Sequence, residues 1–303
     1  QPTKIALEGD VATYGEYIRL QKAFGLDDSA TSGAATTILR RARSVKTPYE
    51  IEQTRLSGIK HAELYTKIKS LFKPGMTDTE LAIELEYESR RLGSLGSMRI
   101  FGRSMEIFVG SVLVGANADS PSPYDFALGG AGMDNSLPIG SSGTAITSGT
   151  TVMVDVCGNF NRYMTDMTRV FSYGILPDKV LQAHEVALEM QRRLEQMVKN
   201  GTPTADVYNM CVELAKQESL GEYFMGHSQQ AGFVGHGVGL EINEMPVLAP
   251  RSREIFETGV VFAFEPKFVF PEIGAVGIEN TFLVKEDSVE KLTIFEESII
   301  SLD

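Results

Sequence analysis

The chain has 303 residues, of which 43% are apolar and 22% are charged. These proportions are typical of a globular protein and exclude a disordered or fibrous chain, and no apolar run reaches the roughly 18 residues of a membrane-spanning helix. Lysine and arginine total 28 against 40 aspartates and glutamates, a formal net charge of −12. Because this charge repels phosphate backbones, we expect no nucleic-acid partner, and we expect no membrane partner either.

Cysteine and histidine are scarce in this sequence. Cys157 and Cys211 are too few for a disulfide framework, which favours a reducing compartment, and we expect a cytoplasmic protein. The chain begins with Gln1 and has no charged-then-apolar signal pattern, so we expect a fragment or a processed product. The histidines are His61, His184, His227 and His236.

The amino-terminal part resembles the end of another unit. Residues 3–10 favour a strand that leads into a turn, residues 15–25 favour a helix, and the residues after them favour a polar loop. We therefore divide the chain into an amino-terminal segment, 1–43, and a main unit, 44–303.

Two capping boxes mark the first helices of the main unit. Thr47 and Glu50 form the first, which predicts a helix over about 48–72. The second begins at Thr77 and predicts a helix over about 78–92.

The same order of elements returns further along the chain. Helical patterns extend over 178–199 and 204–220. Strand-like segments follow each helix pair, over 105–115 and 150–172 after the first and over 258–285 after the second. We interpret this order as an internal duplication of a helix–helix–strand unit, and binding sites often form where such halves meet. The similarity is equally compatible with two unrelated helical hairpins that share glycine and threonine at their joints.

Two aspartates face each other across a predicted hairpin. Residues 150–157 alternate, with valines on one face and Asp155 and Cys157 on the other. For a turn centred between residues 160 and 161, Asp155 lies directly opposite Asp166, with Cβ atoms about 5 Å apart. Two carboxylates this close repel each other unless a proton or a cation lies between them, so the pair favours a cation site.

Two glutamates and a histidine extend this pattern. Glu265 and Glu279 each lie in a strand-like apolar run, where an unpaired charge would cost several kcal/mol. His236 lies between glycines, and taken alone it is more simply interpreted as a core histidine in a turn. Together the four carboxylates and one imidazole suit two divalent ions such as Mn, Fe, Co or Zn. Two such ions would hold a hydroxide between them for attack on a carbonyl.

With these motifs the sequence resembles the pita-bread metallopeptidases, which include methionine aminopeptidase, prolidase and Xaa-Pro aminopeptidase. The resemblance covers about residues 44–300. It rests on Asp155 and Asp166 eleven positions apart, GHGVGLE around His236, FEP around Glu265 and IEN around Glu279. Residues 41–50 also resemble the segment that joins the amino-terminal and catalytic domains in the prolidase branch.

The resemblance implies an α+β fold, a duplicated pita-bread core in which helices cover a curved antiparallel sheet. It implies a homodimer, and it identifies residues 1–43 as the remnant of a creatinase-type amino-terminal domain with its linker. The implied function is that of a hydrolase of the Xaa-Pro aminopeptidase or prolidase type, which uses two divalent metal ions (Mn, Co, Fe or Zn) on a peptide substrate. The implied metal ligands are Asp155, Asp166, His236, Glu265 and Glu279.

Three positions depart from the family pattern. Ser122 replaces a histidine that ends an SGxNAAxPH-like stretch, Asn243 replaces the histidine of an LEVHE-like stretch, and Gly277 replaces the arginine of a GVRIED-like strand. In peptidase members such groups bind the substrate carbonyl and move protons. We therefore expect slow amide hydrolysis, because general acid–base groups contribute about 10²–10⁴-fold in rate.

The candidate catalytic residues are Glu265, His236 and Asn243. Glu265 would orient the hydroxide or take its proton, and Asn243 could donate a hydrogen bond to a developing oxyanion. His227 could supply the missing histidine function or lie on the surface.

Two alternatives to a peptidase stay open. The same metal site could act on a small non-peptide molecule, or the chain could be a weak or inactive metal-binding homologue that acts as a binding protein. The long polar stretch 115–142 could cover the mouth of the site or be disordered.

Overall fold

The computed structural model describes residues 5–26, 34–101, 105–124 and 126–303. The helices are α1 (Tyr14–Phe24), α2 (Ala34–Ser44), α3 (Pro48–Tyr65), α4 (Ile68–Leu71), α5 (Asp78–Arg91), α6 (Asp178–Met197) and α7 (Thr204–Gln217), with a 3₁₀ helix over Gly115–Asp119. The strands are β1 (Met98–Ile100), β2 (Met105–Ile107), β3 (Gly110–Val114), β4 (Thr150–Gly158), β5 (Thr165–Tyr173), β6 (Gly235–Gly237), β7 (Glu244–Val247), β8 (Val261–Phe264), β9 (Lys267–Phe270), β10 (Gly274–Gly277), β11 (Asn280–Val284), β12 (Val289–Lys291) and β13 (Ile300–Ser301). Of the helices in this described part, none combines the length and apolarity that crossing a membrane requires.

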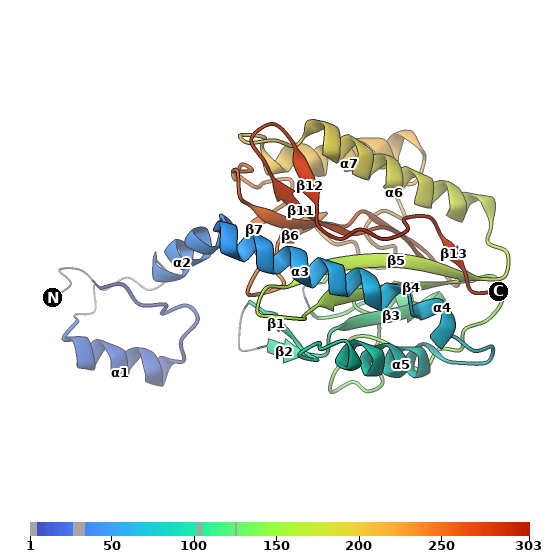
Figure 1. Ribbon diagram of the computed structural model, residues 1–303, viewed down its shortest axis with the longest axis horizontal. Coiled ribbons are helices and arrows are strands. Elements are labelled where there is room, and N and C mark those ends of the chain that lie inside the picture. Colours follow the sequence, from blue (N-terminus) through green and yellow to red (C-terminus); the bar gives the residue numbers. More distant parts are fainter. Residues whose placement is uncertain (1–4, 27–33, 102–104, 125) are drawn as a thin grey trace.

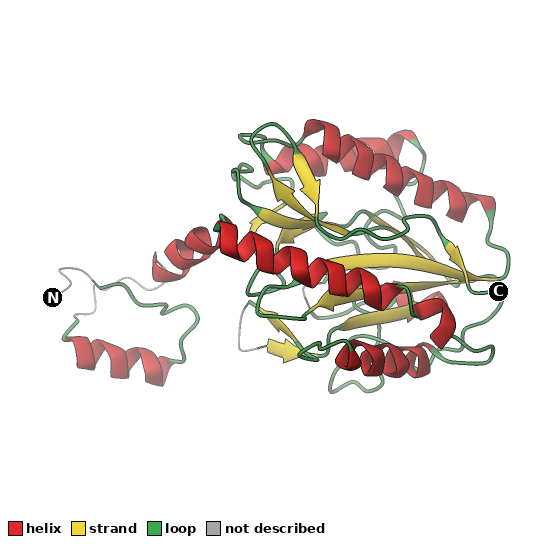
Figure 2. Ribbon diagram, viewed as in Figure 1, coloured by secondary structure: helices red, strands yellow, loops and turns green. Residues whose placement is uncertain are grey.

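Two larger sheets form the centre of the molecule. One has the strand order β13-β5-β4-β3 and the other the order β12-β11-β8-β6-β7, and β1-β2 and β9-β10 pair separately. The strand pairs are antiparallel, apart from the short parallel contact of β13 with β5. In Figure 1, α6 and α7 lie on one side of the strands and α5 on the other, while α1 stands away from this body. Figure 2 shows the strands in the middle and the helices around them.

Each helix pair shares a buried apolar cluster with strands of its own half. Leu64 of α3 and Leu85 of α5 share a buried apolar cluster with Val154 of β4. Met190 of α6 lies in a second cluster with Phe262 of β8. A helix with one apolar face must bury that face against another element, and in each half the helices bury it against a layer of strands. The duplicated α+β arrangement predicted from the sequence is confirmed.

Both predicted capping boxes are present. Thr47 caps α3 and Thr77 caps α5, each in reciprocal hydrogen bonds with a glutamate three residues later. The single helix predicted over 48–72 is divided, because the backbone N–H of Lys67 donates to Leu64 O at 3.0 Å in a tighter turn that separates α3 from α4.

The prediction for the amino-terminal segment was partly wrong. The expected helix is present as α1, but part of the expected polar loop is α2, and residues 5–8 of the expected strand have no regular structure. Residues 3 and 4 lie outside the described residues. Tertiary ion pairs hold α2: Arg43 contacts Glu241 at 2.9 Å and Glu244 at 2.6 Å. Local sequence patterns carry no record of such distant partners.

The predicted register of the aspartate hairpin was also wrong. Asp155 lies opposite Thr168, and Asp166 lies opposite Cys157, so the turn is centred between residues 161 and 162. Within the connecting loop, residues 159–164, the Asn161 side chain accepts a hydrogen bond from the backbone of Tyr163 at 2.8 Å. Since the shift is an even number of residues, both aspartates keep the same face of the sheet.

A buried arginine joins the two halves where β5 approaches β11. Arg169 of β5 is 1% exposed, and burial lowers its pKa to about 10. Its guanidinium donates to Asn280 Oδ1 (2.9 Å) and to the backbone carbonyls of Thr168 (2.8 Å), Glu279 (2.8 Å), Phe295 (3.3 Å) and Glu296 (2.7 Å). The hydrogen bonds to Glu279 and Asn280 fix the strand that follows β10 against the first half.

We predict that Arg169→Met lowers the free energy of unfolding by about 3 kcal/mol or more, because several buried carbonyl groups lose their donor. Urea unfolding followed by circular dichroism measures this change. Arg192→Met is the matched control: Arg192 is exposed on α6 and pairs with Glu189 at 2.9 Å, so we expect a loss below about 1 kcal/mol. Equal losses in the two variants would contradict this role of Arg169.

Candidate metal centre

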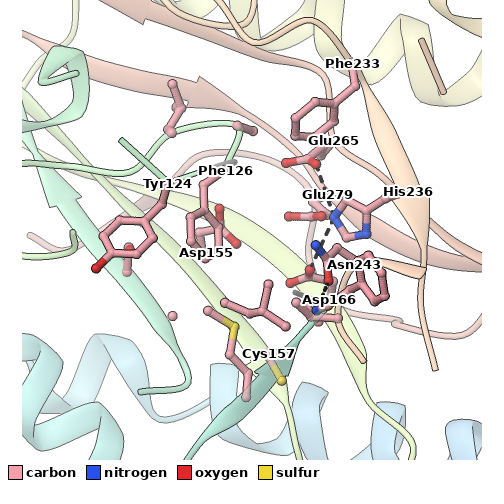
Figure 3. A pocket seen from close by; sticks show the side chains of 18 of the residues that line it. Tyr124, Phe126, Asp155, Cys157, Asp166, Phe233, His236, Asn243, Glu265 and Glu279 are labelled. Carbon is pink, nitrogen blue, oxygen red and sulfur yellow. Dashed lines mark hydrogen bonds and ion pairs between the residues drawn. The ribbon is translucent and has the colours of Figure 1, made fainter. Parts of the chain in front are cut away.

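Five side chains from both halves of the fold line one cavity. Asp155 is on β4 and Asp166 on β5, whereas His236 is on β6, Glu265 follows β8 and Glu279 lies between β10 and β11. The cavity has a volume of about 300 Å³, within the range of small-molecule sites. Figure 3 shows these residues facing one another. We name this set of five the candidate metal centre.

The ligand atoms of the candidate metal centre fall into two groups. Asp166, His236 and Glu279 form one, and Asp155, Glu265 and Glu279 form the other, with the atoms of each group within 4.8 Å of one another. Glu279 belongs to both groups. Carboxylates with one imidazole are the donors that divalent transition ions bind.

His236 is oriented with one nitrogen toward the carboxylates. Its Nδ1 donates to the backbone carbonyl of Gly237 at 3.2 Å, so Nδ1 carries the proton. Its Nε2 lies 3.4 Å from Glu265 Oε1 and 3.9 Å from Asp166 Oδ2. Burial acts to lower the pKa of His236, but the hydrogen bond and charge of Glu265 outweigh it and raise that pKa. A histidine held by a carbonyl in this way has the usual arrangement of a metal ligand.

Glu279 has one satisfied and one unsatisfied oxygen. Oε2 accepts hydrogen bonds from Thr168 Oγ1 at 2.7 Å and from Lys267 Nζ at 3.3 Å. Oε1 is buried and has no hydrogen-bond partner among the residues that the structure describes. Because an unsatisfied buried acceptor is costly, this atom is suited to a cation.

Lys267 enters the candidate metal centre from β9, and the sequence reasoning missed it. Its side chain is fully buried. Its Nζ contacts Asp155 Oδ2 (2.8 Å), Glu265 Oε2 (2.7 Å) and Glu279 Oε2 (3.3 Å). Burial acts to lower the pKa of Lys267, but these carboxylates raise it well above its usual range. The signal was present, since Lys267 interrupts the apolar run after Glu265, where a buried charge needs partners.

Burial and mutual repulsion set the pKa values of the carboxyl groups. Burial, followed by the charge of Glu265, raises the pKa of Glu279 to about 8. Burial, followed by the charge of Glu279, raises the pKa of Asp166 well above its usual range. Burial also acts to raise the pKa of Glu265, but the Lys267 ammonium and the imidazole outweigh it and lower that pKa to about 2. One ammonium thus leaves negative charge uncompensated, which favours a bound cation.

Most of the remaining cavity wall is apolar and comes from both sides of the site. It includes Met98, Ile100, Phe101, Tyr124, Phe126, Leu128, Phe233, Ile242 and Val247. Tyr124, Phe126 and Leu128 belong to the stretch 115–142, so this part of the stretch lines the site; residue 125 lies outside the described residues. Cys157 also lines the cavity, and burial raises the pKa of its thiol, which argues against a nucleophile.

The positions that depart from the family pattern lie in three different places. Asn243 lines the cavity, and its Oδ1 accepts a hydrogen bond from the backbone of Phe101 at 2.7 Å. Ser122 does not line this cavity; its Oγ donates to Pro138 O at 3.1 Å. Gly277 lies opposite Lys267 in the β9–β10 pair.

Histidines other than His236 do not line the cavity in the described part of the chain. His227 Nδ1 lies 3.2 Å from Asp119 Oδ2, its side chain is 40% exposed, and its ring stacks on Tyr223. Of the two expectations for His227, the structure therefore supports the one that places it on the surface, away from the cavity.

Comparison with known proteins agrees with this geometry. Residues 52–286 match the model of metallopeptidase family M24. The Xaa-Pro dipeptidase of Pyrococcus furiosus is 32% identical over 170 residues, which are 56% of this chain and 47% of that protein, so the match spans about half of the relative. The uncharacterized peptidase YqhT of Bacillus subtilis is 26% identical over 300 residues, 99% of this chain and 75% of that protein.

Solved structures share the fold. The X-Pro aminopeptidase from Thermotoga maritima has a TM-score of 0.80 at 27% identity, and the Xaa-Pro dipeptidase from Bacillus anthracis has a TM-score of 0.80 at 28% identity. Each comparison covers 98% of this chain and 74% of the other. The family match over 52–286 and this shared architecture show that the chain belongs to metallopeptidase family M24 and has its pita-bread fold.

Proposed function

We propose that this protein is a divalent-metal-dependent hydrolase that cleaves the bond before proline in small Xaa-Pro peptides. The observation that carries the proposal is the buried, unsatisfied Oε1 of Glu279, a residue that lies in both groups of possible metal ligands with three other carboxylates and the imidazole of His236. The relatives named Xaa-Pro dipeptidase and X-Pro aminopeptidase supply the substrate class. The proposed ligands are drawn from Asp155, Asp166, His236, Glu265 and Glu279.

The side chains of the cavity have separate tasks in this proposal. When bound, a divalent ion supplies Lewis acidity toward the substrate carbonyl and the attacking water. Glu265 stays ionised beside Lys267 and accepts a hydrogen bond from that water, which orients it. Phe101 holds the oxygen of the Asn243 amide, so its Nδ2 is the end that donates to the developing oxyanion. The apolar wall excludes other water.

A free carboxylate on the substrate has a partner in Arg40 of α2. Among the described residues that line the cavity, Arg40 is the one lysine or arginine. Its guanidinium lies 4.0 Å from the centre of the Phe101 ring and donates to Asn243 O at 3.0 Å. Its Nε is buried without a hydrogen-bond partner among the described residues. We propose that Arg40 binds the carboxylate of an Xaa-Pro dipeptide, since arginine recognises carboxylates well.

A small non-peptide molecule is the second candidate substrate. The observation that favours it is that His236 is the one histidine lining the cavity within the described residues. A site that cannot move protons through further histidines suits a substrate with a better leaving group than a peptide amine.

Further expectations from the resemblance stay predictions. They are the homodimer, the identity and number of the metal ions, and the assignment of residues 1–43 to an amino-terminal domain. The proposed role of Arg40 makes that segment part of the substrate site.

We predict that Asp166→Asn lowers kcat/KM for Xaa-Pro dipeptides by about 10³-fold or more, because a ligand of the ion loses its charge. Proline release, measured by chromatography after loading with Mn²⁺, Co²⁺, Fe²⁺ or Zn²⁺, gives the rates. Asp206→Asn, an exposed position on α7, is the control and keeps wild-type rates. If the wild-type protein cleaves neither Xaa-Pro dipeptides nor longer Xaa-Pro peptides when loaded with any of these four ions, the proposal is rejected.

We predict that Arg40→Met raises KM for an Xaa-Pro dipeptide by about tenfold, which corresponds to about 1.4 kcal/mol of lost binding. The carboxyl-terminal amide of the same dipeptide has no carboxylate, so its KM should change little. Arg41→Met, an exposed neighbour on α2, is the matched control. An equal rise in KM for both substrates would exclude carboxylate recognition by Arg40.

A further inference from the structure

Lys267 occupies one of the two groups of possible metal ligands. Its ammonium contacts Asp155 at 2.8 Å, Glu265 at 2.7 Å and Glu279 at 3.3 Å. Asp155, Glu265 and Glu279 are also one of the two sets that could hold an ion. In the second set, Asp166 and His236 pair with no lysine or arginine among the described residues, and only Glu279, which both sets share, contacts Lys267.

The backbone around Lys267 is built to hold its side chain in this position. Gly277 lies opposite Lys267 and has a backbone φ of +140°, an angle that residues other than glycine rarely adopt. A Cβ at Gly277 would lie 2.3 Å from Pro266 O and 2.7 Å from Lys267 Cα. The carbonyl of Lys267 also accepts a hydrogen bond from Met225 N at 2.8 Å. Gly277 therefore leaves the space that the buried lysine occupies.

Charge balance sets how many divalent ions can join this lysine. The candidate metal centre has four carboxylates, and Lys267 neutralises one of them. A single divalent ion neutralises two more, which leaves a small negative excess. A second divalent ion would need the oxygens that the ammonium already contacts, and it would bury a like charge within a few Å of Nζ, where repulsion is screened least.

We propose that the Lys267 ammonium takes the place of one of two divalent ions, so that the protein binds a single ion through Asp166, His236 and Glu279. Asp155 and Glu265 then act mainly as partners of Lys267. This inference rests on the proposed metal-dependent function. It assigns the free Oε1 of Glu279 to the side of the bound ion and Oε2 to the side of Lys267.

Counting bound ions tests the inference directly. The full chain is stripped with a chelator, saturated with Mn²⁺, passed through gel filtration and analysed by mass spectrometry of the metal. We expect one Mn²⁺ per wild-type chain and two per Lys267→Met chain, because methionine has similar length and no charge. Two ions in the wild-type chain, or one in a folded Lys267→Met chain, would overturn the inference.

Matched variants separate this effect from a general loss of structure. Lys46→Met removes another buried lysine, which pairs with Glu244 at 2.8 Å outside the candidate metal centre, and it should keep one ion. His236→Gln should abolish binding. Asp155→Asn should keep one ion and weaken its affinity by about tenfold at most, as for a residue behind the ligands. Loss of the ion in Asp155→Asn would contradict the assignment.

A spectroscopic readout decides the matter even if Lys267→Met does not fold. Electron paramagnetic resonance of the wild-type protein should show the six-line signal of an isolated Mn²⁺ at every ratio up to saturation. A coupled signal from two ions about 3.5–4 Å apart would overturn the inference. Failure to cleave any Xaa-Pro peptide with one ion bound would reject the proposed function alone, and peptide cleavage with two bound ions would reject the role of Lys267 alone.

Discussion

The four carboxylates of the candidate metal centre line one cavity, and burying them together requires buried positive charge. Lys267 supplies part of that charge. Its ammonium and the imidazole of His236 both contact the carboxylate of Glu265. Because two of the carboxylates come from β4 and β5 and the other two from the second half, their charge can be balanced only when both halves are assembled. The charge balance of the site therefore depends on the packing of the two halves against each other.

A second buried cation stabilises the same junction without taking part in the site. Arg169 satisfies backbone carbonyls and Asn280, and Thr168, the residue before it, donates to Glu279. The isolated bridge between Thr168 and Glu279 joins the two sheets at this point. Small errors in the position of a ligand cost much of a metal site's affinity, so a rigid junction of this kind is what a two-half site needs.

Two of the positions that depart from the family pattern, Gly277 and Asn243, lie next to basic residues in the structure. Gly277 lies opposite Lys267, so the strand pair still carries a basic residue, but on the other strand. Asn243 is held by Phe101 and lies beside Arg40, which comes from the segment before the main unit. The cavity therefore differs from the expected one in its charges and hydrogen-bond donors more than in its scaffold.

From the sequence alone we predicted the duplicated architecture, both capping boxes and the five residues that the structure brings to one cavity, because these depend on local periodicity, cap chemistry and charges placed in apolar runs. The sequence reasoning missed α2, the register of the aspartate hairpin and Lys267. Contacts that the local pattern does not encode accompany each of these: glutamates far along the chain hold α2, and a hydrogen bond between Asn161 and Tyr163 lies in the loop of the shifted hairpin. The position of Lys267 also depends on tertiary structure, since its three carboxylates come together only when β4, the end of β8 and the β10–β11 connection pack around β9. Spacing along a chain specifies which residues are unusual, whereas only tertiary structure decides which charges share a cavity.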